Sequence, residues 1–273
     1  MRDISCGLPA KSGCTFAIED TCMNINEVLQ IALEAGEILL RNGAETYRVE
    51  ESVNKICNGL GFSCETIVFP TSIFLTVVSP EQISETSAKR IKVRTLNLLK
   101  IDSVNSFSRN LSSNPISYLE AMKELDNIKA LKTYSTSLQL VSASVVTFAF
   151  AMLFGGSIED SFAAMITGLI AYILNFLMLK ADYFPFLIHF VLGCVCGILS
   201  LLTSFFYVGG NVYIIIISSV ILYLPGVSMT NGIRDLLVGD SVSGLTRLGE
   251  AILTVIALGM GVGLALSMEK YLF

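Results

Sequence analysis

Five long apolar segments in the second half of the chain restrict what it can fold into. An α-helix needs roughly 20 predominantly apolar residues to cross the hydrocarbon core of a bilayer, and each segment approaches that length. Gly193 with Gly197, and Gly259 with Gly263, are spaced to seat such helices closely against one another. The expected transmembrane helices are about 135–154, 161–179, 186–206, 212–230 and 250–268.

Charged residues divide the chain into two parts. Residues 1–132 hold 30 of the 41 Asp, Glu, Lys and Arg side chains, and residues 133–273 hold 11. We therefore expect a flexible N-terminal tail at 1–23, a cytoplasmic α+β domain at 24–132 and a membrane domain at 133–273. The expected fold class is a membrane all-α protein with five transmembrane helices, preceded by a small soluble α+β domain. No basic patch interleaved with aromatic residues points to nucleic acid.

The distribution of Lys and Arg predicts the orientation of the membrane domain. Fourteen of these cations precede the first expected transmembrane helix, and Lys180, Arg234 and Arg247 lie in the connectors after the second and the fourth. Only Lys270 follows the fifth. Lys and Arg concentrate on the cytoplasmic side of membrane proteins. We therefore expect a multi-pass protein of the inner (plasma) membrane, with its N-terminus in the cytoplasm and its C-terminus outside.

Hydrophobic periodicity predicts the elements of the first part. Helices are expected at 27–41, 44–58, 102–111 and 117–131, and strands at 65–69, 72–78 and 90–96. Asn42-Gly43 is a stop signal for the first helix, and Ser117 with Glu120 forms a capping box at the fourth. The first two strands could pair at an edge with another copy of the chain.

The cysteines and the single histidine do not form a metal-binding pattern. The seven cysteines include no CxxC pair, and His189 lies inside the third expected transmembrane helix, so no metal site is expected. No nucleotide-binding or nucleophile motif occurs, and we expect no cofactor and no catalytic residue. One enzymatic alternative stays open, a membrane-anchored hydrolase using carboxylates such as Glu45, Glu50 and Glu51. His189 is either a hydrogen-bonded buried imidazole or a proton relay.

The stretch 222–250, LYLPGVSMTNGIRDLLVGDSVSGLTRLGE, places a helix break and a cluster of charges between two apolar segments. Pro225-Gly226 would interrupt a helix and release backbone polar groups, which is tolerated only against protein or a water-filled cavity. Two interpretations remain open, a cytoplasmic loop with solvated charges and part of a substrate pathway. The pathway candidates are Pro225, Gly226, Asn231, Arg234, Asp235, Asp240, Arg247 and Glu250, with Asp160 on the opposite side and Asn175 in the second transmembrane helix.

The charges of this stretch suit the transport of a small carboxylate or amino acid. Arg234 and Arg247 are the only arginines in the membrane part, and a guanidinium binds a carboxylate through two parallel hydrogen bonds. Asp235, Asp240 or Glu250 could carry a coupling proton if burial or pairing neutralises the carboxylate. The pair Arg234–Asp235 could equally be a surface ion pair that contributes little.

Two sequence blocks resemble a known family. GAETYRVEES at 43–52 and LPGVSMTNGIRDLLVGDSVSGLTRLGEA at 224–251 look like the N-terminal-half protein of the threonine/serine exporter family. The resemblance covers about residues 26–268. It implies a soluble domain followed by five transmembrane helices. The remaining helices would then come from the same longer chain or from a small companion subunit.

The resemblance implies export of small amino acids such as threonine and serine, and the split, two-subunit members are associated with export of dicarboxylates such as succinate. The chain stops after five expected helices, so it resembles the split form and implies a companion membrane subunit, a homo-oligomer or both. The resemblance also implies importance for residues of both blocks, namely Gly43, Glu45, Arg48, Pro225, Gly226, Asn231, Arg234, Asp235, Gly239, Asp240 and Arg247. We interpret the chain as a proton-coupled exporter subunit. The hydrolase and a non-transporting membrane scaffold are the alternatives.

Overall fold

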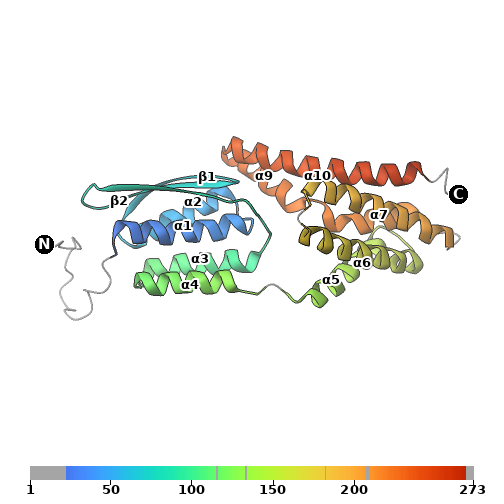
Figure 1. Ribbon diagram of the computed structural model, residues 1–273, viewed down its shortest axis with the longest axis horizontal. Helices are drawn as coiled ribbons and strands as arrows, with labels where there is room; N and C mark the ends of the chain where they lie inside the picture. Colours follow the sequence, from blue (N-terminus) through green and yellow to red (C-terminus); the bar gives the residue numbers. More distant parts are fainter. Residues whose placement is uncertain (1–22, 115, 133, 182, 207–209, 269–273) are drawn as a thin grey trace. The chain divides into compact units, whose positions relative to one another are not determined.

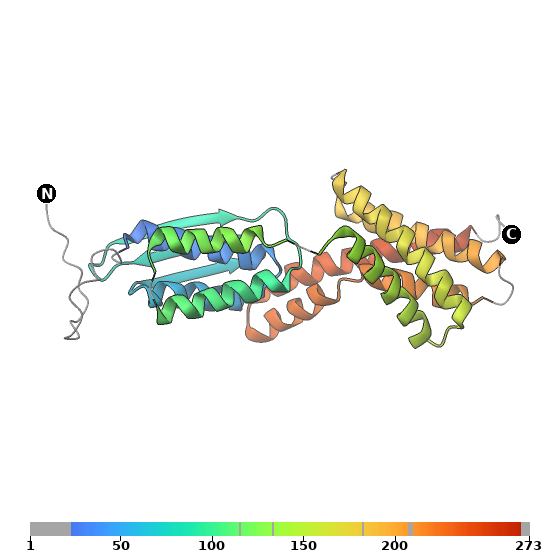
Figure 2. The same ribbon diagram turned by 90° about the horizontal axis from the view of Figure 1, so that it is seen from below.

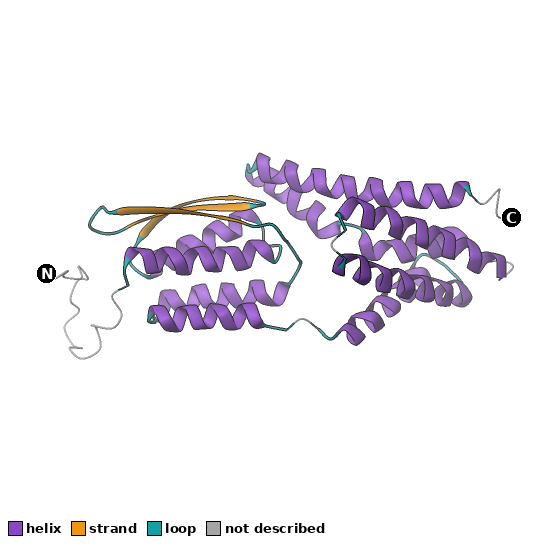
Figure 3. Cartoon of the chain, viewed as in Figure 1, coloured by secondary structure: helices purple, strands orange, loops and turns teal. Residues whose placement is uncertain are grey.

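The computed structural model describes residues 23–114, 116–132, 134–181, 183–206 and 210–268. The expected tail, apart from Met23, lies outside these residues. The chain forms two compact units. The first comprises Met1–Thr133 with Arg234–Gly244, and the second comprises Tyr134–Ile233 with Leu245–Phe273. The described strands all belong to the first unit, and the second is built from helices (Figure 3).

The first unit has three layers, which Figures 1 and 2 show from two sides. A three-stranded antiparallel sheet of order β1-β2-β3 packs against α1 and α2, and α3 and α4 cover the other side of these helices. The elements are α1 (Ile25–Arg41), α2 (Thr46–Gly59), β1 (Ser63–Phe69), β2 (Ser72–Val78), β3 (Ser84–Arg90), α3 (Leu98–Ser113) and α4 (Tyr118–Ala130).

Local signals in the sequence account for the helix ends. Asn24 and Glu27 form a capping box at the start of α1, and Ser117 with Glu120 forms the expected one at α4. The chain leaves α1 through Gly43, whose φ of +90° is a conformation that favours glycine. Four helices and the strands β1 and β2 therefore lie where the periodicity predicted them, with ends shifted by a few residues.

The prediction of a strand at 90–96 is wrong. The third strand is β3, which ends at Arg90, and the residues after it run without regular structure along the end of α1. The Thr95 N–H donates to the Arg41 carbonyl at 2.8 Å, and the Asn97 N–H donates to the Asn42 carbonyl at 3.1 Å. These donors complete the C-terminal end of a helix instead of a sheet ladder. The alternation of charged and apolar residues there does not reflect a buried strand face.

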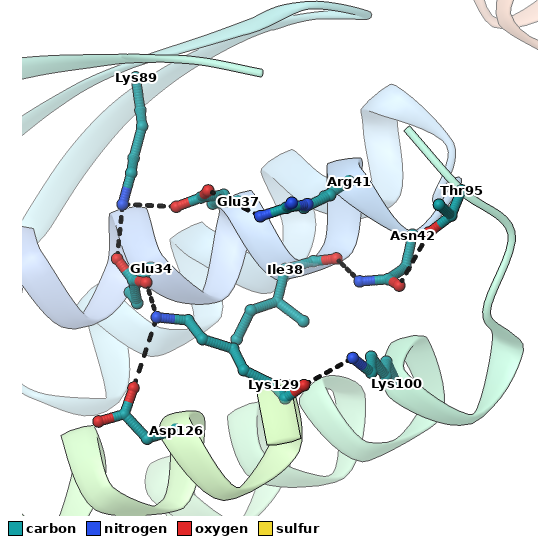
Figure 4. Close-up of polar contacts among 10 residues, drawn as sticks. All are labelled: Glu34, Glu37, Ile38, Arg41, Asn42, Lys89, Thr95, Lys100, Asp126 and Lys129. Carbon is teal, nitrogen blue, oxygen red and sulfur yellow. Dashed lines mark hydrogen bonds and ion pairs between the residues drawn. The ribbon is translucent and has the colours of Figure 1, made fainter. Parts of the chain in front are cut away.

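Ion pairs join the layers of the first unit (Figure 4). Lys89 on β3 binds Glu34 at 2.6 Å and Glu37 at 2.5 Å, both on α1. Lys129 on α4 binds Glu34 from the other side. Burial lowers the pKa of Lys129. Because Glu34 is shared by two cations from two different layers, it fixes α1 between the sheet and α4.

Among the described residues, four helices of the second unit are each long and apolar enough to cross a membrane. A fifth span is counted if α8–η1 and α9 are taken as one, bent by 59° at the break between them. The elements are α5 (Thr136–Leu153), α6 (Ile158–Lys180), α7 (Pro185–Phe206), α8 (Val212–Val220), η1 (Ile221–Tyr223), α9 (Gly226–Val238) and α10 (Ser241–Ser267). Both α9 and α10 run through the boundary between the units, because Arg234–Gly244 belongs to the first.

The stretch 222–250 is mostly helical, which corrects the expectation of a long polar connector. The fourth apolar helix breaks before Pro225, as predicted, but α9 then continues to Val238. Only Gly239 and Asp240 separate it from α10, which begins at Ser241 and not near residue 250. Gly239 has a φ of +103° and ends α9, and the Asp240 carboxylate accepts a hydrogen bond from the Ser243 N–H at 3.2 Å.

On α10, close helix packing uses Gly261 and not the predicted Gly259 and Gly263. A Cβ added at Gly193 would strike the Leu258 carbonyl, and one at Gly261 would strike the Phe190 carbonyl, so α7 and α10 meet with their backbones nearly in contact. Gly259 and Gly263 have no described atom within 4 Å of an added Cβ. The helical phase explains this, because buried α10 residues fall on the face of Gly261.

This packing predicts different outcomes for two substitutions in the same chain. Gly193→Val should destabilise the chain by about 1–3 kcal/mol or prevent folding, because overpacking forces the backbones apart. Gly259→Val adds the same group in open space and is the matched control. Thermal unfolding of the purified chain in detergent would measure the difference. Equal stability of the two variants would contradict the α7–α10 contact.

Candidate functional site

The two sequence blocks that carry the family resemblance meet within the first unit. The Arg234 guanidinium donates from Nη1 to Oε1 of Glu45, and the Thr46 hydroxyl donates to Oδ1 of Asp235 at 3.2 Å. The partners of each pair are 189 residues apart in sequence. The start of α2 and the end of α9 are thus held together by two adjacent polar contacts, which we call the α2–α9 joint.

Glu45 is the centre of this joint. It occupies the N-cap position of α2, but its side chain does not cap the helix. Instead its carboxylate binds Arg48 at 2.9 Å through one oxygen and Arg234 through the other. Glu45 is 8% exposed. A carboxylate this buried needs charged partners to offset its lost hydration, and here two guanidinium groups supply them.

Asp235 is the second buried acid of the joint, and only 1% of its surface is exposed. Its contact with the fully buried Thr46 fixes the side chain. Its backbone carbonyl accepts a hydrogen bond from the Asp240 N–H at 2.9 Å. The backbone of Asp235 thus closes the turn after α9, while its side chain belongs to the joint.

Glu50 lies one turn further along α2 from the joint. It accepts a hydrogen bond from the Val68 N–H at 3.2 Å. Burial raises the pKa of the Glu50 carboxyl above its ordinary value, the Val68 hydrogen bond opposes this, and the charge of Asp240 raises the pKa further. Glu50 and Asp240 are thus close enough to interact. The joint and its surroundings bring several carboxyl groups and two guanidinium groups together in the first unit.

The three carboxylates named for a hydrolase each have a different environment. Glu45 is engaged by two arginines, and Glu50 accepts from the sheet backbone. Glu51 lines a separate open pocket of about 650 Å³ together with Lys55. Among the residues that the structure describes, no group of three or more His, Cys, Asp or Glu could hold a metal ion. The Nδ1 atom of His189 lies 2.7 Å from the Pro185 carbonyl oxygen, one turn earlier in α7.

Asp160 has a local structural role in the second unit. It is 5% exposed and forms a capping box with Ser157 at the start of α6. Its Oδ2 accepts from the Ser157 N–H at 3.0 Å, and its Oδ1 accepts from the Asn211 N–H at 2.9 Å. The carboxylate therefore joins the connector before α6 to the one before α8. Asn175, the other candidate outside the 222–250 stretch, is half-buried on α6.

Beside the break between η1 and α9 lies a residue that the sequence analysis did not single out. Tyr223, directly before the break, is 9% exposed, and its hydroxyl has no hydrogen-bond partner among the described residues. Gly226 begins α9 directly after Pro225. An unpaired buried hydroxyl is costly. A tyrosine next to Pro-Gly in an otherwise apolar helix was the signal that could have identified it.

The remaining candidates lie on both sides of the α9–α10 turn. Arg247 on α10 is 6% exposed, whereas Glu250, one turn later, is exposed. Asn231 on α9 is half-buried. About half of the Arg234 side chain is exposed, although its guanidinium contacts Glu45. The two arginines of the stretch therefore have different environments, one buried in the second unit and one at the edge of the joint.

A double-mutant cycle tests the joint. The variants Glu45→Ala and Arg234→Ala should each loosen the first unit, with a coupling free energy of about 0.5–3 kcal/mol because the residues are in contact. The control is Arg41 with Glu37, a pair at 3.9 Å in which the Arg41 side chain is 56% exposed, and its coupling should be about 0.5 kcal/mol or less. The rate at which the buried Cys57 thiol becomes reactive, with the other cysteines changed to serine, reports opening of this unit. A coupling no larger than the control would refute the joint.

A known protein family matches the chain over a range that includes both sequence blocks. The family model "Putative threonine/serine exporter" (ThrE) matches residues 30–269. The chain is 24% identical over 246 residues to "Probable succinate transporter subunit YjjP" of Klebsiella aerogenes, covering 88% of this chain and 93% of that protein. The Escherichia coli protein of the same name is also 24% identical, with 88% and 94% covered.

A more distant relative is the "Probable threonine/serine exporter" of Mycobacterium tuberculosis, 18% identical over 262 residues. The match covers 95% of this chain but 49% of that protein. No solved structure matches the chain. The family match spans most of the chain and includes both halves of the joint. The chain therefore belongs to the threonine/serine exporter family of multi-pass membrane proteins.

Proposed function

We propose that the chain is one subunit of a proton-coupled inner-membrane exporter for a small amino acid, such as threonine or serine, or a dicarboxylate, such as succinate. The printed names of the relatives support both substrate classes. Each class carries a carboxylate, so each needs a cationic or hydrogen-bonding contact in the pathway. The first unit would lie in the cytoplasm, as the distribution of Lys and Arg favours.

The observation that carries the proposal is the broken apolar helix. Val212–Tyr223 and Gly226–Val238 meet at 59°, with Pro225 between them. A helix that ends inside hydrocarbon leaves backbone groups without partners, which is tolerated where the break lines a polar pathway. The N-terminus of α9 carries partial positive charge, which suits a carboxylate. Tyr223 would add its buried hydroxyl at the same break.

Arg247 is the stronger candidate for a substrate contact among the two arginines. It is nearly fully buried in an apolar helix, where an ionised side chain is costly and commonly functional. Arg234 already binds Glu45 and is better suited to maintaining the joint. We therefore assign the substrate carboxylate to Arg247 and the α9 N-terminus.

Asp235 is the first choice for the coupling proton. It is the most buried of the three candidate acids, and burial favours the protonated form of a carboxyl group. Asp240 caps α10 with its carboxylate, and Glu250 is exposed. Since Asp235 contacts Thr46 at the start of α2, a change in its protonation would act directly on the joint.

A companion subunit would complete the pathway. Two relatives are named as subunits, and the M. tuberculosis relative is about twice as long as the part that this chain matches. Gly259 and Gly263 lie on an exposed face of α10, with nothing described within 4 Å of an added Cβ. Small residues four apart let a second helix approach closely in a membrane. This face is where we expect the companion to bind.

Efflux from loaded cells tests the proposal. Labelled serine, threonine and succinate would be followed in cells that express this chain with and without a candidate companion. Efflux that requires both chains is expected, and dissipation of the proton gradient should abolish it. Efflux from this chain alone would instead indicate a homo-oligomeric pathway. No efflux of any label, with both proteins in the membrane, would favour a scaffold.

Single substitutions test the residue assignments. Arg247→Gln and Asp235→Asn should lower efflux by at least about tenfold, since losing one charged contact costs about 1.4 kcal/mol or more. Tyr223→Phe should also lower efflux but leave folding unchanged, because the hydroxyl it removes has no partner among the described residues. Arg109→Gln, an exposed cation on α3, is the control. Normal efflux by the three test variants would refute the assignments.

A further inference from the structure

Residues 90–100 of the first unit, RIKVRTLNLLK, combine basic and exposed apolar side chains. The segment holds four cations and no acidic residue. Arg90 and Lys92 are exposed. Four large apolar side chains are more than half exposed, which is unusual so close together on one surface. They are Val93 at 59%, Leu96 at 54%, Leu98 at 69% and Leu99 at 57%.

The backbone of this segment is held firmly against α1. Ile91 is buried in the core of the first unit, and the Thr95 and Asn97 N–H groups bond to the end of α1. The Asn42 side chain also contacts Thr95, as Figure 4 shows. Gly43 allows this approach, because an added Cβ would lie 3.1 Å from Leu96 and 3.2 Å from the Thr95 carbonyl. The exposed leucines are therefore presented by a fixed backbone.

The segment lies at the end of the first unit where the chain passes on to the apolar helices. Lys100 donates to the Lys129 carbonyl at 2.6 Å, in the last turn of α4 (Figure 4). The first apolar helix, α5, begins at Thr136, six residues after α4 ends at Ala130. Six residues reach about 20 Å at most. Where α5 starts at a membrane surface, the connector would thus keep this end of the first unit within about 20 Å of that surface.

We propose that residues 90–100 bind the membrane surface, with the exposed Arg90 and Lys92 on anionic lipid headgroups and Leu98 and Leu99 inserted among the lipids. Basic residues beside exposed apolar ones are the pattern of interfacial membrane binding. A protein partner fits less well, because the cores of protein interfaces are depleted in Lys and enriched in aromatic residues, and the segment has no aromatic residue. The proposal requires only a membrane protein and is independent of transport.

Tryptophan fluorescence can test this directly, because the chain has no Trp. Leu98→Trp would report on the segment. Leu119→Trp is the matched control, since Leu119 is 77% exposed and lies about 15 Å from Lys129 along α4. The full chain would be reconstituted in vesicles of phosphatidylcholine with brominated acyl chains, with or without phosphatidylglycerol. We expect L98W to be quenched by the bromine at least about twofold more than L119W, and more strongly with phosphatidylglycerol.

A double substitution tests whether the cations of the segment are needed for binding to anionic lipid. Arg90→Gln with Lys92→Gln should remove much of the extra quenching that phosphatidylglycerol produces, and so should salt at about 1 M, where the Debye length is about 3 Å. Quenching of L98W no greater than that of L119W would overturn the proposal. A blue-shifted but unquenched L98W would also overturn it and show that protein covers the segment. Quenching that is the same without phosphatidylglycerol would overturn the role of the anionic lipid.

Discussion

The buried carboxylate of Glu45, held between Arg48 and Arg234, is the interaction on which the arrangement of both motifs depends. Removing one partner of a buried pair leaves an uncompensated charge, which is strongly destabilising. Glu45 therefore keeps both of its guanidinium partners only while the end of α9 is docked on α2. The Thr46–Asp235 hydrogen bond reinforces this docking. Since α9 is itself the second half of the broken helix, the joint links α2 directly to that helix.

Under the proposed function, this link couples α2 to the helix break. Asp235 lies ten residues after Pro225, so α9 itself connects the break to the Thr46–Asp235 contact. Under the proposed function, a proton on Asp235 would weaken its acceptor role toward Thr46 and shift α9. Such a shift would change the helix terminus that faces the substrate. The buried Tyr223 hydroxyl and Arg247 would supply the remaining contacts.

Much of the fold could be predicted because short-range signals specify it. Apolar spacing located α1, α2 and the long apolar helices, and Ser117 with Glu120 marked the start of α4. The segment 90–96 misled the prediction because only Ile91 is buried while Val93 and Leu96 are exposed, so alternation there does not imply a sheet face. The α2–α9 joint could not be predicted, since a contact across 189 residues leaves no mark in the spacing of one sequence. Its members were singled out by chemistry, but in two separate groups.

A cysteine cross-link in membranes would test the joint most directly. Thr46→Cys and Asp235→Cys would be combined in a chain whose native cysteines are serine, with a protease site inserted after Lys132. Mild oxidation followed by cleavage should leave the two fragments joined, because the original side chains approach to 3.2 Å. In the control, Leu237→Cys replaces Asp235→Cys. Leu237 is 82% exposed, so no cross-link to Thr46→Cys is expected and the two fragments should separate. Fragments that separate in both cases would show that the first unit and the α9–α10 turn are not docked, and the account of the joint would fail.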